Sequence, residues 1–349
     1  MMDISTPYYS DFSRISNSNI GWFLNKGPAF LRAKLDGKIE DESTTALERG
    51  SMIHMYLLQP EEFLNTYKLC KGTKPKSANQ EKFVQVLVNS TEIDYDKALL
   101  EAFKSAYSTI GRSKDEMLSK AKQMALELNE YITDVRSGKK LISEYDTWLL
   151  NKISENISQH KMASKLLKPT FTIYDTETSE DEAKVALGKT EGLHIAEALY
   201  HEFHINWEYN GLKCKSLLDS LHLDFKNKVF TIVDLKTTVK IYHFEDSMKD
   251  YDYLRQLYYY RMAVEWYLKN ELGEDPNKWE KRYFIIAIDT VEKNHDVRVF
   301  GFTASQFEKD CTKDRICFAL DDIKWHFDTG QWEHSRDYYA GNGIESLNL

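Results

Sequence analysis

Three charged side chains lie in two neighbouring runs of β-forming residues, where charge is unusual. Asp219 belongs to the run 213–224, and Asp234 and Lys236 end the run 228–236. A short polar turn joins the runs and predicts a hairpin, in which facing side chains are about 5 Å apart. Asp234 and Lys236 are two residues apart and therefore project from the same face of their strand. Two carboxylates in this arrangement suit a hard divalent cation such as Mg²⁺. The lysine could orient or deprotonate a water molecule beside the cation.

Each of these residues alone has an ordinary structural explanation. A lone aspartate at a strand end is usually a turn former or a cap, and a lone lysine is usually a solvated charge. The strand that holds Asp234 and Lys236 is mostly apolar, however, and its expected place is central in a sheet. Burying both charges there without partners costs on the order of several kcal/mol. The combination therefore indicates a functional site.

The order Asp, hairpin turn, Asp-x-Lys resembles the signature of the PD-(D/E)XK nuclease superfamily. Asp219, Asp234 and Lys236 match its three positions, although Leu218 replaces the proline that often precedes the first aspartate. Within the superfamily, the chain is similar to the RecB-like exonucleases of the exodeoxyribonuclease VIII (RecE) group. That resemblance, which covers over half of the chain, suggests a phage or prophage recombination nuclease.

Two further motifs carry this narrower resemblance. Gly50 and His54 form a Gly-x-x-x-His helix followed by a Leu-Leu-x-Pro-x-x-Phe stretch, and Gln256 and Tyr260 form a Gln-x-x-x-Tyr motif after the Asp-x-Lys strand. A spacing of four places each pair on one helical face. Alone, a histidine such as His54 is more often a core residue than a ligand, and Gln-x-x-x-Tyr carries little information. Their order around the hairpin makes the motifs mutually supporting.

The resemblance implies a metal-dependent phosphodiesterase site. It assigns a Mg²⁺ ion, or Mn²⁺ in its place, to His54, Asp219, Asp234 and the main-chain carbonyl of Leu235. Lys236 is expected to position the attacking water and to offset charge in the transition state.

The same resemblance gives roles to residues around the metal. Gln256 and Tyr260 are expected to orient the catalytic lysine or the DNA backbone. Related exonucleases also carry a glutamate near the metal or the scissile phosphate, and Glu202 is the first candidate for it. Three other glutamates compete for this role: Glu191, Glu197 and Glu208.

Composition excludes several classes of protein. The 349 residues are 42% hydrophobic and 29% charged, as in globular proteins, and they contain no long uncharged apolar run that predicts a membrane span. The N-terminus shows no secretory signal, and four scattered cysteines predict a reducing compartment. We therefore expect the cytoplasm, that of a bacterial host if the chain is phage-encoded. Only Cys311 and Cys317 are close in sequence, which argues against a nuclease with an iron–sulfur cluster on four cysteines.

The formal net charge of -9 does not exclude a nucleic-acid enzyme. A local basic track is enough to bind DNA, and a cluster of metal-binding carboxylates itself makes the net charge more negative. Lys213 and Lys215 flank the Asp219 strand. They either meet phosphates or are exposed strand lysines.

The pattern of elements predicts an α/β fold with a restriction-endonuclease-like core, a mixed central sheet and flanking helices. We expect a helical N-terminal region at 1–170, with the His54 helix and a helical insertion, and the nuclease core at 171–349, the two forming one integrated nuclease domain. Helical residues are expected at 16–35, 44–58, 142–167 (with a break), 251–270 and 305–327. Strands are expected at 201–208, 213–224, 228–236, 282–289 and 297–303.

Together these features predict an exonuclease that hydrolyses linear double-stranded DNA from its ends, 5′ to 3′. The expected partners are double-stranded DNA ends, a single-strand annealing protein and further copies of the chain, with no membrane. Two alternatives remain: a structure-specific endonuclease on the same core, and a catalytically inactive nuclease fold that binds DNA. The complete set of His54, Asp219, Asp234 and Lys236 argues against the inactive fold.

Overall fold

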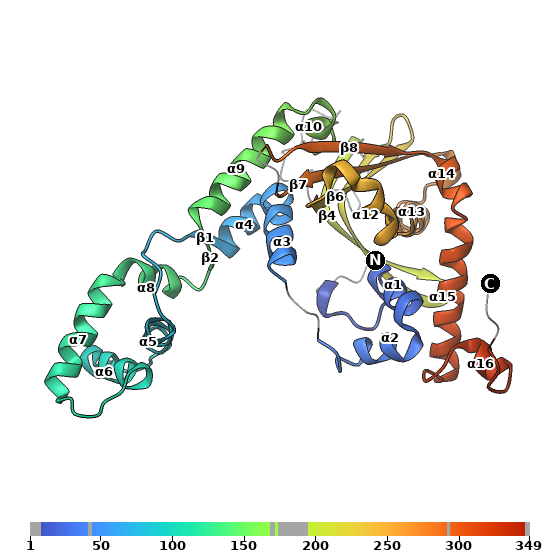
Figure 1. Cartoon of the computed structure of the whole chain (residues 1–349). Coiled ribbons are helices and arrows are strands. Elements are labelled where there is room, and N and C mark those ends of the chain that lie inside the picture. Colours follow the sequence, from blue (N-terminus) through green and yellow to red (C-terminus); the bar gives the residue numbers. More distant parts are fainter. Residues whose placement is uncertain (1–7, 41–43, 168–171, 174–194, 292–293, 346–349) are drawn as a thin grey trace. The chain divides into compact units, whose positions relative to one another are not determined.

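Among the residues that the structure describes, strands of the C-terminal half form a six-stranded mixed sheet (Figure 1). The structure is a computed structural model that describes residues 8–40, 44–167, 172–173, 195–291 and 294–345. The strands are β3 (Thr172–Ile173), β4 (Ile195–Tyr209), β5 (Leu212–Asp224), β6 (Val229–Thr238), β7 (Glu280–Asp289) and β8 (Val297–Phe302). They lie in sequence order, and every neighbouring pair is antiparallel except the parallel pair β6–β7.

Local sequence explains the connections of this sheet. Asn210 and Gly211 join β4 to β5 with φ angles of 47° and 84°, values that suit the two-residue hairpin turn in which Asn-Gly is favoured. A parallel pair cannot be closed by a tight turn. The link between β6 and β7 is accordingly long and consists mainly of the helices α12 (Phe244–Asp250) and α13 (Tyr253–Asn270).

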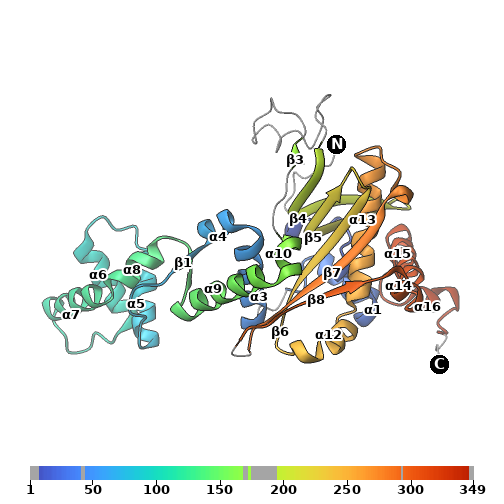
Figure 2. The same ribbon diagram turned by 90° about the horizontal axis from the view of Figure 1, so that it is seen from above.

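The main core lies between the sheet and α13. Leu257 and Val264 of α13 are fully buried in the same apolar cluster as Ile232 of β6 and Ile285 of β7. In Figure 2, α13 lies along the sheet and α15 (Thr312–Thr329) lies beyond it. The N-terminal helices α1 (Asn17–Lys26) and α2 (Pro28–Leu35) belong to this core as well, through residues such as Ile20 and Leu31. This face therefore fixes the position of both α13 and the N-terminus.

Two further helices pack against the sheet. The helix α3 (Thr45–Leu58) packs against β5 and β6, and α10 (Lys161–Leu167) packs against β8. Shorter helices complete it: α14 (Ala304–Lys309), α16 (Arg336–Ala340) and the single turns η1 (Tyr8–Ser10), η2 (Ile241–His243) and η3 (Pro276–Lys278).

The chain divides into two compact units. One consists of residues 1–58 and 153–349, and the other of residues 59–152. The second unit contains α4 (Pro60–Thr66), β1 (Tyr67–Leu69), α5 (Ala78–Val88), α6 (Tyr95–Ala106), α7 (Lys114–Glu127), α8 (Asn129–Arg136) and β2 (Lys140–Ile142). Its core is separate and includes Phe83, Leu99 and Phe103. The long helix α9 (Glu144–Gln159) crosses the boundary between the units.

This division differs from the expected boundary near residue 170. The described residues before 59 pack with the sheet: Ile15 pairs with Cys214 of β5, and α1, α2 and α3 contribute to that unit. The helical insertion exists and is compact by itself. Residue 170 lies outside the described residues.

Most expected elements are confirmed, and two differ in detail. The residues 16–35 form two helices because Gly27, at a φ of 82°, and Pro28 interrupt the backbone. The C-terminal helix is likewise divided into α14 and α15 at Cys311, which has a φ of 50°. The meander β4–β6, the helix at 44–58 and the broken helix at 142–167 are as predicted.

Candidate active site

The site forms where β5 and β6 separate. Their last paired residues are Ser220 and Val233, whereas β6 continues to Thr238 alongside β7 alone. One residue beyond the last pair, Asp219 Oδ2 accepts a hydrogen bond from the Leu235 N–H at 2.6 Å. The Asp219 carboxylate thus replaces a main-chain carbonyl as the hydrogen-bond acceptor for β6, at the point where β5 and β6 stop pairing. The expected hairpin is present, and its two aspartates lie at the fork between the strands.

Asp234 and Lys236 form a buried ion pair at this fork. Asp234 is 1% exposed, and Lys236 Nζ lies 2.7 Å from its Oδ2. Apart from this ion pair, neither Asp234 oxygen has a hydrogen-bond partner among the described residues. Burial raises the pKa of Asp234 to about 6, although Lys236 acts in the opposite direction. Burial also disfavours the ammonium form of Lys236, but attraction to Asp234 and Asp219 outweighs it and raises the pKa of Lys236.

The ring of Tyr253 supports this lysine. Lys236 Nζ lies 4.9 Å from the centroid of the Tyr253 ring, a cation–π distance. Burial raises the pKa of the Tyr253 phenol to about 12, so the hydroxyl stays neutral at ordinary pH. Sequence reasoning missed Tyr253, because no motif spacing marks the start of α13 as a neighbour of the Asp-x-Lys strand.

The helix α3 brings His54 to the same fork. His54 Nδ1 lies 3.7 Å from Asp219 Oδ2, and ligand atoms of His54, Glu202 and Asp219 all lie within 4.8 Å of one another. Gly50 permits this approach, because a Cβ atom there would lie only 3.1 Å from Thr237 Oγ1 of β6. Burial, and then the charge of Lys236, lowers the pKa of His54 to about 4. The imidazole is therefore neutral at pH 7 and keeps a lone pair for a metal.

Glu202 reaches the cluster through an irregular backbone. It has a φ of 49° and lies on β4 between the paired residues His201 and Phe203, which places it opposite Asp219. Burial, and then repulsion by Asp219 and Asp234, raises the pKa of Glu202 to about 8. The Glu202 carboxyl group therefore interacts with the charges of Asp219 and Asp234.

The competing glutamates lie elsewhere or are not described. Glu197 contacts His222, at 3.4 Å between Oε2 and Nε2, and Glu208 faces Lys213 on β5. Glu191 lies outside the described residues. Of the described candidates, Glu202 is the one in the cluster with His54 and Asp219.

Gln256 and Tyr260 form a connected pair on α13. Gln256 Nε2 donates a hydrogen bond to Tyr260 Oη at 2.8 Å. Burial, and then the negative charges of Asp234 and Asp219, raises the pKa of the Tyr260 phenol. The Gln-x-x-x-Tyr motif thus lies within electrostatic reach of the fork, on the helix that covers this face of the sheet.

The chemistry of these residues fits a divalent metal. Three carboxyl groups offer hard oxygen donors, and a neutral imidazole adds one borderline nitrogen donor. Burial is the main cause of the raised pKa values of Asp234 and Glu202, and repulsion between the carboxylates adds to it. Apart from the contact with Lys236, neither Asp234 oxygen has a hydrogen bond among the described residues. A bound cation would offset the repulsion between the carboxylates and would give the Asp234 oxygens a partner.

Comparison with known protein families agrees with this geometry. Residues 16–335 match the family model of the PDDEXK-like domain of unknown function (DUF3799), and the chain therefore belongs to that family. Membership of the PD-(D/E)XK superfamily and the α/β nuclease fold, both predicted from the sequence, are confirmed. Nucleases with this fold typically use a divalent metal. A search of curated proteins finds no match. In the described ranges, no helix is long and apolar enough to cross a membrane.

The raised pKa values predict that the metal-free protein loses stability as the pH rises. A carboxyl group whose pKa is higher in the folded than in the unfolded chain favours folding only while it is protonated. With folded values of about 6 for Asp234 and about 8 for Glu202, this contribution is complete below about pH 4 and is lost towards about pH 8. Below about pH 6.5 the lowered pKa of His54 acts in the opposite direction, because its protonation favours the unfolded chain. We therefore expect the Tm in a chelating buffer to fall between about pH 6.5 and 8, and Glu202→Gln to flatten this fall.

Differential scanning calorimetry at a series of pH values measures this effect. Glu197→Gln, on the same strand but outside the cluster, is the matched control and should keep the slope of the parent chain. A Tm that does not change with pH in the parent, or an equal flattening by Glu197→Gln, would contradict the coupling of these carboxylates.

Proposed function

We propose that the protein is a metal-dependent DNA exonuclease that hydrolyses phosphodiester bonds of linear double-stranded DNA. The observation that carries the proposal is the buried cluster of acidic groups and Lys236 at the β5–β6 fork, in a chain of the PDDEXK-like family. Such a cluster is costly to the fold unless a cation occupies it. A metal held next to an ammonium group is the arrangement needed to attack a phosphodiester.

The metal-holding residues are those at the fork. We propose that His54, Asp219, Asp234 and the carbonyl of Leu235 hold Mg²⁺ or Mn²⁺, with Glu202 as a further ligand or as the neighbour of a second ion. Bound there, the ion would act as a Lewis acid, which lowers the pKa of a bound water molecule and stabilises the leaving oxygen.

The other residues orient the reactants. Lys236 can direct an N–H donor at the attacking water and offset negative charge in the pentavalent transition state, because Asp234 and the Tyr253 ring hold its ammonium group in place. Gln256 and Tyr260, joined by their hydrogen bond, present a neutral donor from α13 to the lysine or the DNA backbone. None of these groups reads a base edge, so cleavage should be independent of sequence.

The preference for DNA ends rests on the motifs around the fork. The Gly50–His54 helix and the Gln256–Tyr260 pair resemble the exodeoxyribonuclease VIII group, whose members act from 5′ ends, form rings and work with a single-strand annealing protein. We propose the same polarity, a homo-oligomer and such a partner for this chain. A structure-specific endonuclease on the same fold is the alternative that the experiments below separate.

Loss of any one central residue should abolish a metal-dependent DNase activity. We expect Asp219→Ala, Asp234→Ala and Lys236→Ala each to lower the cleavage rate of linear DNA by about 100-fold or more in Mg²⁺ or Mn²⁺. Asp219→Ala and Asp234→Ala should remain folded by circular dichroism, because each removes one of the repelling carboxylates. Lys236→Ala leaves Asp234 without its counter-ion and should lower the Tm of a chain that is still folded at the assay temperature. Asp328→Ala, at an exposed position of α15, is the control with unchanged activity. A folded central variant with full activity would refute the assignment.

The products should show attack from ends. With duplexes labelled at the 5′ or the 3′ end and a covalently closed circle, we expect early release of 5′ mononucleotides and an intact circle. Affinity carried by phosphate contacts also predicts a steep fall in activity between about 50 and 200 mM salt. Rapid nicking of the circle would instead favour the endonuclease, and early release of the 3′ label would reverse the polarity.

A further inference from the structure

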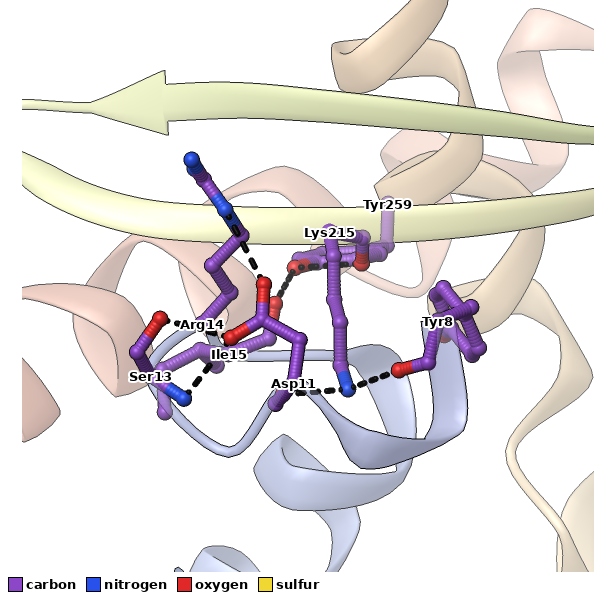
Figure 3. Close-up of polar contacts among 7 residues, drawn as sticks. All are labelled: Tyr8, Asp11, Ser13, Arg14, Ile15, Lys215 and Tyr259. Atoms are coloured by element: carbon purple, nitrogen blue, oxygen red, sulfur yellow. Dashed lines mark hydrogen bonds and ion pairs between the residues drawn. The ribbon is translucent and has the colours of Figure 1, made fainter. Parts of the chain in front are cut away.

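An N-terminal arm, residues 8–15, is fixed to β5, the strand that carries Asp219 (Figure 3). The Ile15 N–H donates to the Lys213 carbonyl at 2.9 Å, and the Lys215 N–H donates to the Ile15 carbonyl at 2.8 Å. The buried hydroxyl of Tyr259 donates to the same Ile15 carbonyl at 2.5 Å. The C-terminal end of the arm is thus part of the sheet-bearing unit.

Lys215 fixes the other end of the arm. It is 6% exposed, and its Nζ donates to the main-chain carbonyls of Tyr8 and Asp11, both at 2.6 Å (Figure 3). The same Nζ lies 4.6 Å from the centroid of the Tyr8 ring. Burying an ammonium group is costly unless hydrogen bonds satisfy it, so these carbonyls must remain in place. Lys215 is therefore an internal anchor, not a phosphate contact or an exposed strand lysine.

The arm turns one aromatic ring inward and exposes the next. Tyr8 packs edge-to-face against His204 of β4, with ring centroids 5.2 Å apart, and against Tyr9 at the same distance. Tyr9 itself is 79% exposed. His204 lies two residues along β4 from Glu202, and Lys215 lies four residues along β5 from Asp219, so the arm rests on the two strands that carry these carboxylates.

We propose that the arm holds Tyr9 as a fixed stacking platform for a nucleotide of the DNA substrate next to the scissile phosphate. The proposal rests on the proposed function. In the metal-free protein the carboxylates at the fork repel phosphates, so DNA needs a contact there that does not depend on charge. An aromatic ring supplies one, because every base has a face on which it can stack. The anchored backbone reduces the entropy that binding would otherwise cost.

The test is a comparison of Tyr9→Ala with Tyr9→Phe in the full chain. A linear duplex with 2-aminopurine close to its end reports stacking by fluorescence quenching, and its anisotropy gives the Kd in a chelating buffer without cleavage. We expect Tyr9→Ala to raise the Kd about tenfold and to lose the quenching, and Tyr9→Phe to behave as the parent. Tyr95→Ala, an exposed tyrosine at the start of α6 in the other unit, is the control with no effect.

Salt distinguishes stacking from charge. The Kd ratio of Tyr9→Ala to the parent should be the same at about 50 and about 200 mM salt, because a stacking contact releases no counterions. Lys215→Met keeps an apolar stem but removes the anchor, and it should lose the quenching while Tyr9 is still present. Unfolding curves show whether this variant is folded; Tyr9→Ala decides the proposal in either case.

Two results would overturn the proposal: unchanged Kd and quenching in Tyr9→Ala, or a loss in Tyr9→Phe as large as in Tyr9→Ala. Failure of the proposed function is a separate outcome, since it would appear as a parent chain that cleaves no DNA with Mg²⁺ or Mn²⁺.

Discussion

The structure depends on one interruption of a β-ladder. Beyond Ser220 and Val233, β5 and β6 no longer pair, and the Asp219 carboxylate accepts the Leu235 N–H. This hydrogen bond stabilises the fork, but it brings a carboxylate into a region where Asp234 is already buried. Like charges in a poorly solvated site raise the free energy of the folded state. The neighbouring elements reduce this free-energy cost.

Each neighbour either offsets the negative charge or closes the site. Lys236 supplies a positive charge from within β6, and the Tyr253 ring lies against that lysine. The helix α3 comes near enough to place the neutral His54 beside Asp219 because Gly50 has no side chain. Charge compensation within the chain is incomplete, since one ammonium group faces the carboxylates of Asp219 and Asp234, and Glu202 adds a third carboxyl group that ionises at about pH 8. The remaining negative charge is what makes the fork suitable for a cation.

The sequence allowed the centre of the site to be predicted, but not its edges. Asp219, Asp234 and Lys236 follow from the two-residue period of strands and from one short turn, both local features. The place of Glu202 depends on its positive φ and on the cross-strand register, which no spacing encodes. Tyr253 and Lys215 act through contacts between elements distant in sequence, so propensity and periodicity do not reveal them. The membership of the sheet-bearing unit likewise depends on long-range contacts, such as the pairing of Ile15 with Cys214.

The most direct measurement is the change of Tm when Mn²⁺ or Mg²⁺ is added to the metal-free protein at about pH 8. An ion that binds only the folded chain stabilises it by about 4 kcal/mol at 1,000 times its Kd. We expect the parent chain to gain several degrees in Tm. Asp234→Asn, which keeps the shape but removes the charge, should be more stable than the parent in chelator and should respond little to the ion. A parent chain whose Tm does not respond to either ion, or an Asp234→Asn variant that responds as strongly as the parent, would contradict the claim that the fork is built to hold a cation.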